Sequence, residues 1–270
     1  MKKHLIALSL SLTTVALAQA APASLCQVGL DGETRAYRLH VPPTLTGPVP
    51  VVIALHDEGE QALAFESTSR FSQVADEDNF LVVYPEARGG HWNHSDDVAF
   101  LRSVVQDVSE QYTVDPARIF ATGKGSGGDL AARLGTQASD LVAAVAPVGA
   151  DQAVNWNVPQ QLVRPVSVLA IDAAPGLAPV LKRWCAASGA TQEQPDTGVS
   201  KLNRDVFSSV GGNTEVVHVQ LPSLGDAWPT ARSAPLDATR EIWKFFELHP
   251  RKAQELPRSR KSPQRFCMAW

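Results

Sequence analysis

Short apolar runs with the composition of buried β-strands alternate along the chain with segments of helical pattern. Two of them, VVIAL at Val51–Leu55 and LVVY at Leu81–Tyr84, are apolar throughout, which is typical of strands covered on both faces. This alternation favours an α/β fold, with a mainly parallel sheet and helices on both of its faces. The expected strands are Tyr37–Val41, Pro50–Leu55, Phe80–Tyr84, Arg118–Thr122, Val142–Val148, Val166–Ile171 and Glu215–Leu221.

Two helices can be placed against these strands. One is expected to begin at Ser95, because Asp96 and Asp97 then lie at the positive end of its dipole. The other is expected from about Leu236 to Leu248 and ends before Pro250. The chain of 270 residues has no visible internal repeat and suits one domain.

The first 20 residues have the three parts of a secretory signal. Lys2 and Lys3 form the positive end, Leu5–Leu17 the apolar run, and Ala18-Gln19-Ala20 a small-x-small cleavage site. The apolar run is too short and too rich in Ser and Thr for a stable membrane span. We therefore expect a signal peptide at 1–20, a single domain at 21–249, a basic C-terminal tail at 250–270, and a secreted or periplasmic location.

Charge is unevenly distributed along the chain. The formal net charge is −4, but eight of the 24 Lys and Arg lie in the first 20 and the last 20 residues. The body at 21–250 holds 16 bases against 27 acids. An acidic body gives no reason to expect binding to nucleic acid. We interpret the basic tail as solvated or loosely docked on the domain.

Three cysteines allow at most one internal disulfide and leave an odd thiol. An exported protein meets an oxidising environment in which such a bridge can form. A link between Cys26 and Cys267 would tie both termini to the domain, but the sequence does not choose between the pairs that include Cys185.

The strand at Arg118–Thr122 runs into a glycine-rich turn and then a helix, which is the architecture of a hydrolase nucleophile elbow. With its flanking motifs, the chain resembles the secreted polyhydroxybutyrate depolymerases and feruloyl esterases. That resemblance implies an α/β-hydrolase fold and covers nearly all of the chain after residue 20. The motifs, in order, are LHVPP at Leu39–Pro43, VVIALH at Val51–His56, LVVYPE at Leu81–Glu86, DDVAF at Asp96–Phe100, VDPARIFATGKGSGG at Val114–Gly128, LVAAVAPVGA at Leu141–Ala150 and GDAWP at Gly225–Pro229.

The resemblance implies T-G-x-S-x-G-G at the elbow, and the ungapped match places Gly125 at the nucleophile position. Making Ser126 the nucleophile instead would put Lys124 where the elbow needs glycine. We expect Gly125 to have the strained, positive-φ backbone of the elbow. A serine substituted there is expected to fit sterically and to cost about 1 kcal/mol in strain.

The other catalytic positions are substituted too. The family's G-H-x-W-P motif carries the general base, and here Asp226 takes the place of the histidine. An aspartate, with a reference pKa of about 4, is a far weaker base than imidazole. Asp172 lies close to the family's third triad position, after the strand at Val166–Ile171, in a shortened loop.

The family's first core strand leads into H-G, which helps to build the oxyanion hole. Here the segment His56-Asp57-Glu58-Gly59-Glu60 follows that strand, and its three carboxylates would oppose an oxyanion if they stayed near the hole.

Four side chains are expected near the cleft: His56, Trp92, Lys124 and Trp228. The tryptophans could stack on a sugar or phenolic ring, although packing is the commoner role of a tryptophan. Lys124 could contact an anionic ligand or simply be solvated. His91 and His94 have a spacing compatible with metal binding, but no further ligand pattern joins them, so no metal site is expected. The chain has neither G-x-G-x-x-G nor a P-loop, so no cofactor is expected.

Two hypotheses about function follow. The first is an exported α/β-hydrolase-fold protein that has lost triad esterolysis and binds a small-molecule, ester or polysaccharide-type ligand. The second is an active serine carboxylesterase that uses Ser126. Fold alone does not decide between them, so the geometry of the site must.

Overall fold

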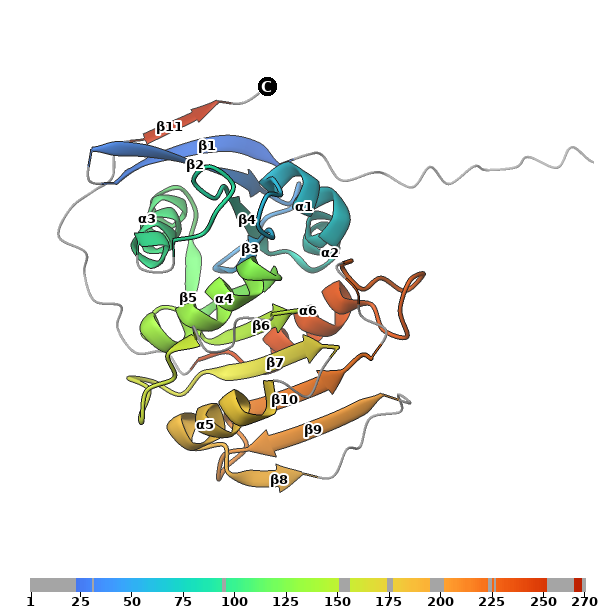
Figure 1. The fold of residues 1–270 in the computed structure, drawn as a ribbon. Helices are drawn as coiled ribbons and strands as arrows, with labels where there is room; N and C mark the ends of the chain where they lie inside the picture. The colour runs from blue at the N-terminus through green and yellow to red at the C-terminus, as the bar shows by residue number, and fades with distance from the viewer. Residues whose placement is uncertain are drawn as a thin grey trace, which may run out of the picture.

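A mainly parallel sheet runs through the whole domain (Figure 1). The computed structural model describes residues 23–30, 32–93, 96–150, 156–173, 177–194, 202–222, 225, 227–251 and, as backbone, 265–268. In this part of the chain the strand order is β11-β1-β2-β4-β3-β5-β6-β7-β10-β9-β8. The six central strands, from β4 to β10 in that order, are parallel, and the strands on either side of them pair antiparallel. The predicted α/β architecture is confirmed.

The described strands are β1 (Ser24–Leu30), β2 (Glu33–His40), β3 (Val49–Leu55), β4 (Leu81–Pro85), β5 (Val114–Lys124), β6 (Ala144–Val148), β7 (Ser167–Asp172), β8 (Gln192–Gln194), β9 (Asn203–Ser208), β10 (Glu215–Gln220) and β11 (Arg265–Met268). The described helices are α1 (Ala62–Ser69), α2 (Phe71–Asp78), α3 (Asp96–Gln111), α4 (Ser126–Gln137), α5 (Ala178–Ser188) and α6 (Ala238–Leu248). Each of the seven strands expected from the sequence is present within a few residues of its expected bounds. The antiparallel outer strands β1, β8 and β9 were not anticipated.

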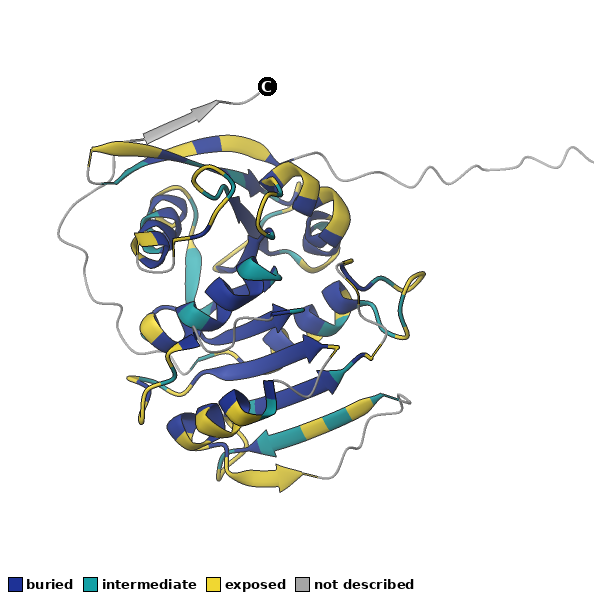
Figure 2. Cartoon of the chain, in the orientation of Figure 1, coloured by how far each residue is buried: buried dark blue, intermediate teal, exposed yellow. Residues whose placement is uncertain are grey.

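The core has two layers, one on each face of the sheet. Side chains from α3, α4 and α5 pack on one face, and side chains from α1, α2 and α6 pack on the other. The central strands β3, β4, β6 and β7 are buried throughout, because helices cover them on both sides (Figure 2). By contrast, β8 is fully exposed and β9 is only partly buried.

Two parts of the basic C-terminal tail contact the domain. The Arg251 N–H donates to the Ala117 carbonyl at 2.7 Å, and its guanidinium binds two further carbonyls. Arg265–Met268 pairs with β1, so this stretch of the tail is docked on the sheet, which is one of the two alternatives that the sequence left open. Residues 252–264 and the predicted signal peptide lie outside the described residues.

The pairing of β1 with β11 favours one of the disulfides that the sequence left open. Cys26 lies directly opposite Cys267 in the antiparallel register. Opposed residues of such a pair have Cα atoms about 4.5–5.5 Å apart, which suits a disulfide. Cys185 is buried on α5, where burial raises the pKa of its thiol to about 11.

We therefore expect peptide mapping under non-reducing conditions to find a Cys26–Cys267 bridge in protein recovered from an oxidising compartment. Cys185 should remain a slowly reacting thiol, since little thiolate forms near neutral pH at such a pKa. Cys185→Ala is the control and should leave the bridge intact. A bridge that includes Cys185 would contradict the register of β1 and β11.

Candidate active site

Gly125 forms the sharp turn between the central strand β5 and helix α4. Its backbone angles are φ 52° and ψ −121°, a region that residues with a side chain rarely adopt. The positive φ predicted for Gly125 is confirmed. Ser126 is the first residue of α4 and does not form the tip of the turn. The backbone thus has the shape of a nucleophile elbow whose tip carries no side chain.

Close backbone packing fixes the register of this elbow. A Cβ added at Gly123 would lie 2.5 Å from the backbone of Gly127 and 2.8 Å from the carbonyl oxygen of Leu55. A Cβ added at Gly127 would come under 3.0 Å from the carbonyls of Leu55 and His56. Glycine is therefore required two residues before and two residues after Gly125. This is the G-x-S-x-G spacing with Gly125 in the place of the serine.

The carboxylate of Asp57 occupies the space at the tip of the elbow. A Cβ added at Gly125 would overlap this carboxylate, with each of its three end atoms closer than 3.0 Å. Asp57 Oδ1 accepts the Ser126 N–H at 2.9 Å and the Ser126 hydroxyl at 3.1 Å. In a hydrolase elbow, the N–H that follows the nucleophile position is one donor of the oxyanion hole. In this chain that donor is bound to an internal carboxylate.

Lys124 and Glu60 complete a charged cluster around Asp57. Lys124 Nζ pairs with Glu60 Oε1 and lies 3.9 Å from Asp57 Oδ2. The Asp57 N–H points to Glu60 Oε2 at 3.3 Å. The third carboxylate of this segment, Glu58, pairs instead with His91 on the surface at 2.6 Å. Two of the three predicted carboxylates therefore lie at the elbow, and Lys124 contacts them.

His56 holds the loop that carries Asp57 and does not line an open cleft. The side chain is fully buried, and its Nε2 accepts the Ala87 N–H at 3.1 Å. The proton is therefore on Nδ1, which donates to the Asp57 carbonyl at 2.7 Å. With both ring nitrogens hydrogen-bonded, the orientation of the imidazole is fixed. It positions the backbone of Asp57.

The two tryptophans expected near the cleft pack inside the domain. Trp228 is 2% exposed, lies edge-on against Phe65 with 5.1 Å between ring centroids, and donates its indole N–H to Thr239 Oγ1 at 2.9 Å. Trp92 is 8% exposed and donates to the His56 carbonyl at 2.9 Å. Of the two roles that the sequence left open for these tryptophans, the structure shows packing, in which burial of a large aromatic surface stabilises the core.

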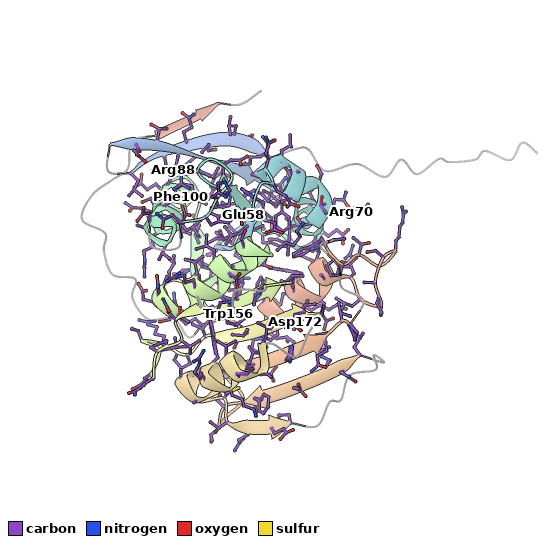
Figure 3. The ribbon with its side chains drawn as sticks, viewed as in Figure 1. Glu58, Arg70, Arg88, Phe100, Trp156 and Asp172 are labelled. Carbon is purple, nitrogen blue, oxygen red and sulfur yellow. The ribbon has the colours of Figure 1, made fainter. Side chains whose placement is uncertain are left out.

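Asp172 has a partner that the sequence did not indicate. Its Oδ1 lies 2.9 Å from Nε2 of His218, and both side chains are buried between β7 and β10. The other ring nitrogen of His218 lies 3.6 Å from Asp205 Oδ2. Figure 3 labels Asp172 and Glu58, which lie apart in that view. Asp226, the substituted base position, lies outside the described residues.

Ser126 has a carboxylate as its hydrogen-bond partner among the described residues, and none of its hydrogen bonds there is to a histidine.

Within the described residues, no group of three His, Cys, Asp or Glu is arranged to hold a metal ion. His91 is paired with Glu58, and His94 lies outside the described residues. Also within the described residues, no helix has the length and apolar character needed to cross a membrane.

The contact between Asp57 and Gly125 adds a cost that the sequence did not indicate, because a side chain at this turn fits only if the Asp57 carboxylate moves. We expect Gly125→Ala to lower the free energy of unfolding by more than the roughly 1–3 kcal/mol of a strained φ, since the Asp57 carboxylate must also move. Gly149→Ala is a matched control, with φ 60° and nothing within 4 Å of the added Cβ. Urea denaturation of both variants gives the comparison.

Combining Gly125→Ala with Asp57→Ala should recover part of the loss, with a coupling of about 1–2 kcal/mol, because the overlap is then absent. Strictly additive effects would contradict the placement of the Asp57 carboxylate at the elbow.

Comparison with known proteins places this geometry in a family. No family model matches the chain. "Putative esterase NocK" of Nocardia uniformis subsp. tsuyamanensis is 31% identical over 252 residues, which cover 75% of this chain and 73% of that protein. Feruloyl esterase B of Piromyces equi is 32% identical over 114 residues, which are 38% of this chain and 21% of that protein. Poly(3-hydroxyalkanoate) depolymerase C of Paucimonas lemoignei is 26% identical over 123 residues, which are 40% of this chain and 30% of that protein.

A solved structure shares the fold. The acetyl xylan esterase of Aspergillus awamori superposes with a TM-score of 0.63 at 15% identity, covering 83% of this chain and 99% of that one. The predicted α/β-hydrolase fold is confirmed, and so is the resemblance to feruloyl esterases and polyhydroxyalkanoate depolymerases.

Proposed function

The chain belongs to the esterase family of α/β hydrolases, and on that premise we propose that it is an inactive member that binds a ligand without hydrolysing it. The observation that carries the proposal is the Asp57 carboxylate at the tip of the elbow. Ester hydrolysis by this family's chemistry needs a nucleophile, a base and a vacant oxyanion hole. The Asp57 carboxylate lies where the nucleophile's side chain would stand, and it binds a donor of the oxyanion hole.

The nucleophile position offers no reacting atom, because Gly125 has no side chain. Loss of a catalytic nucleophile costs about a million-fold in kcat, and the further loss of the base adds little because the two act as one unit. Asp226 stands at the base position. A carboxylate there would be ionised near neutral pH, but its low proton affinity makes it a poor acceptor for a hydroxyl proton.

The oxyanion hole is disfavoured electrostatically as well as sterically. A tetrahedral intermediate places negative charge where donors such as the Ser126 N–H point. Asp57 Oδ1 already binds that N–H at 2.9 Å, and Glu60 is bound to the N–H of Asp57. Lys124 offsets only part of this negative charge. A developing oxyanion would therefore be repelled, and a catalytic donor worth about a hundred- to a thousand-fold in rate would be lost.

The relatives bear names that refer to feruloyl esters, acetylxylan and poly(3-hydroxyalkanoate). We propose a ligand of the same broad kind, an ester or an ester-bearing polysaccharide, for this chain. The signal-like residues 1–20 support a location outside the cytoplasm, where such polymers occur.

An active esterase built on Ser126 is the competing function. The hydrogen bond from its hydroxyl to Asp57 at 3.1 Å supports this alternative, because a carboxylate is a possible proton acceptor. Against it, the same carboxylate oxygen binds the Ser126 N–H, and Ser126 is the first residue of a helix and not the tip of the turn.

We expect the purified protein to hydrolyse p-nitrophenyl acetate, p-nitrophenyl butyrate and methyl ferulate no faster than an unrelated control protein. A fluorophosphonate probe should not label it, whereas an active esterase of the family treated in parallel should be labelled. Labelling or turnover that is abolished by Ser126→Ala and by Asp57→Asn would establish the active-esterase alternative instead.

The structure also indicates what a restored enzyme needs. The pair Gly125→Ser and Asp226→His supplies a nucleophile and an imidazole, but the new serine would meet the Asp57 carboxylate. We expect the pair to be inactive. Adding Asp57→Gly restores the family's H-G motif and vacates the oxyanion site, so it should raise fluorophosphonate labelling and esterase rate at least about 100-fold over the pair.

The matched control for that experiment adds Glu58→Gly to the same pair, because Glu58 pairs with His91 at the surface and not with the elbow. Equal gains from Asp57→Gly and Glu58→Gly would mean that Asp57 is not the obstacle.

A further inference from the structure

A second hollow lies at the end of the sheet opposite the elbow. It has a volume of about 650 Å³ and is formed where β6, β7 and β10 begin, whereas the elbow lies where β5 ends. The residues that line this pocket include Arg164, Pro165, Ser167, Leu248, His249 and Arg251. A cavity of this size is in the range that takes a small organic molecule.

Arg251 brings a half-buried positive charge to this pocket, and among the described residues no carboxylate lies within 4.0 Å of its guanidinium. Its Nη1 donates to the carbonyl of Asp140, and its Nη2 donates to the carbonyl of Pro116 at 2.6 Å. Its Nε is buried and has no hydrogen-bond partner among the described residues. These carbonyl contacts fix the guanidinium in place. The Asp140 carboxylate, which is hydrogen-bonded to Arg102, acts on the Arg251 charge without forming an ion pair with it.

Arg164 adds a second positive charge on the same wall. Its backbone N–H points to Ser139 Oγ at 3.4 Å. Within the described part of the chain, its guanidinium has no carboxylate within 4.0 Å. The two arginines affect each other, since burial and then the nearby charge of Arg164 lower the pKa of Arg251, while the Asp140 carboxylate opposes this lowering. Like charges held together in this way make a site where an anion is stabilised.

The acidic side chains nearby are engaged elsewhere. Asp140 binds both terminal nitrogens of Arg102, and this hydrogen bonding holds the pKa of the Asp140 carboxyl below its usual value. Glu215 lies 3.3 Å from Nε2 of His249, whose Nδ1 donates to the Phe245 carbonyl at 2.6 Å. In a chain whose 28 acids outnumber its 24 bases, this pocket holds two arginines that form no ion pair among the described residues.

Apolar side chains form the remainder of the wall. Ala143, Pro165 and Leu248 line the pocket, and Leu248, the last residue of α6, is 77% exposed. Covering this apolar surface would stabilise a complex, while inorganic phosphate or sulfate would leave it in water. Guanidinium groups bind carboxylates through paired N–H donors.

We propose that this pocket binds a small organic carboxylate that carries a short hydrocarbon chain, with the carboxylate on Arg164 and Arg251 and the chain against Pro165 and Leu248. The site is independent of the elbow and of whether the protein hydrolyses esters.

Isothermal titration of the purified full chain with hexanoate tests the proposal. We expect saturable binding of hexanoate, at least tenfold weaker binding of inorganic phosphate, and no binding of 1-hexanol, which has the chain but lacks the charge. Arg164→Gln should weaken hexanoate binding at least tenfold, and Arg164→Lys should retain part of it. Arg183→Gln removes an exposed arginine on α5 and should leave the affinity unchanged.

Arg251 is not the residue to vary first, because its contacts with the Asp140 and Pro116 carbonyls also stabilise the fold. Thermal unfolding detects any loss of stability in a variant separately from its loss of hexanoate binding. Hexanoate should raise the unfolding temperature of the wild type and of Arg183→Gln, but not that of Arg164→Gln.

The proposal is overturned by the absence of saturable hexanoate binding up to about 10 mM, an affinity too weak to be specific. It is also overturned by equal binding in Arg164→Gln, or by phosphate that binds as tightly as hexanoate. None of these results would bear on hydrolysis at the elbow, which fluorophosphonate labelling reports separately.

Discussion

The close approach of β3, β5 and α4 at Gly123, Gly125 and Gly127 is the constraint on which the centre of this domain depends. The backbone of β3, at Leu55 and His56, lies so near Gly127 that no side chain can stand between them. Since β5 is a central strand with neighbours on both sides, a side chain at Gly123 or Gly127 would displace the middle of the sheet, whereas one at Gly125 would meet the Asp57 side chain. The elbow can therefore persist for reasons of packing even where its tip carries no nucleophile.

The charge at the elbow follows from the same geometry. The N–H groups at the start of α4 are unpaired within the helix and point at the tip of the turn, so they attract an anion. In an active hydrolase this anion is transient, because it is the oxyanion of the reacting ester. In this chain Asp57 supplies a permanent anion, held in place by the buried ring of His56 and partly neutralised by Lys124. On the function proposed above, this arrangement opposes the transition state of ester hydrolysis.

The sequence was sufficient for the features that depend on local pattern. Continuous apolar runs identified the buried strands, and the spacing of glycines identified Gly125 as the tip of the turn, because both are set by backbone requirements. The edge strands β8 and β9 lack such runs, since one or both of their faces meet water. They had no signal to detect.

Contacts between distant segments were less predictable. A motif match indicated that Trp228 and His56 lie in the region of the cleft, but only the packing of Phe65 and Trp92 around them shows that both are buried. The pairing of Asp172 with His218 depends on the register of β7 and β10, which no local pattern specifies. The sequence likewise placed three carboxylates near the elbow without indicating that Asp57 would fill it.

The elbow and the pocket at the opposite end of the sheet differ in how their charge is balanced, and this difference separates a closed anion site from an open one. At the elbow the donors of α4 already have Asp57, and Asp57 has Lys124 nearby, so an incoming anion would have to displace an internal partner. At the pocket, Arg251 donates to carbonyls that carry no net charge, and the nearest carboxylates are bound to Arg102 and His249. An anion that enters there displaces only water. Both sites belong to one acidic chain, so a shortage of acidic residues does not explain why the pocket lining contains no carboxylate among the described residues. The positive charge at the pocket therefore favours binding of an external anion.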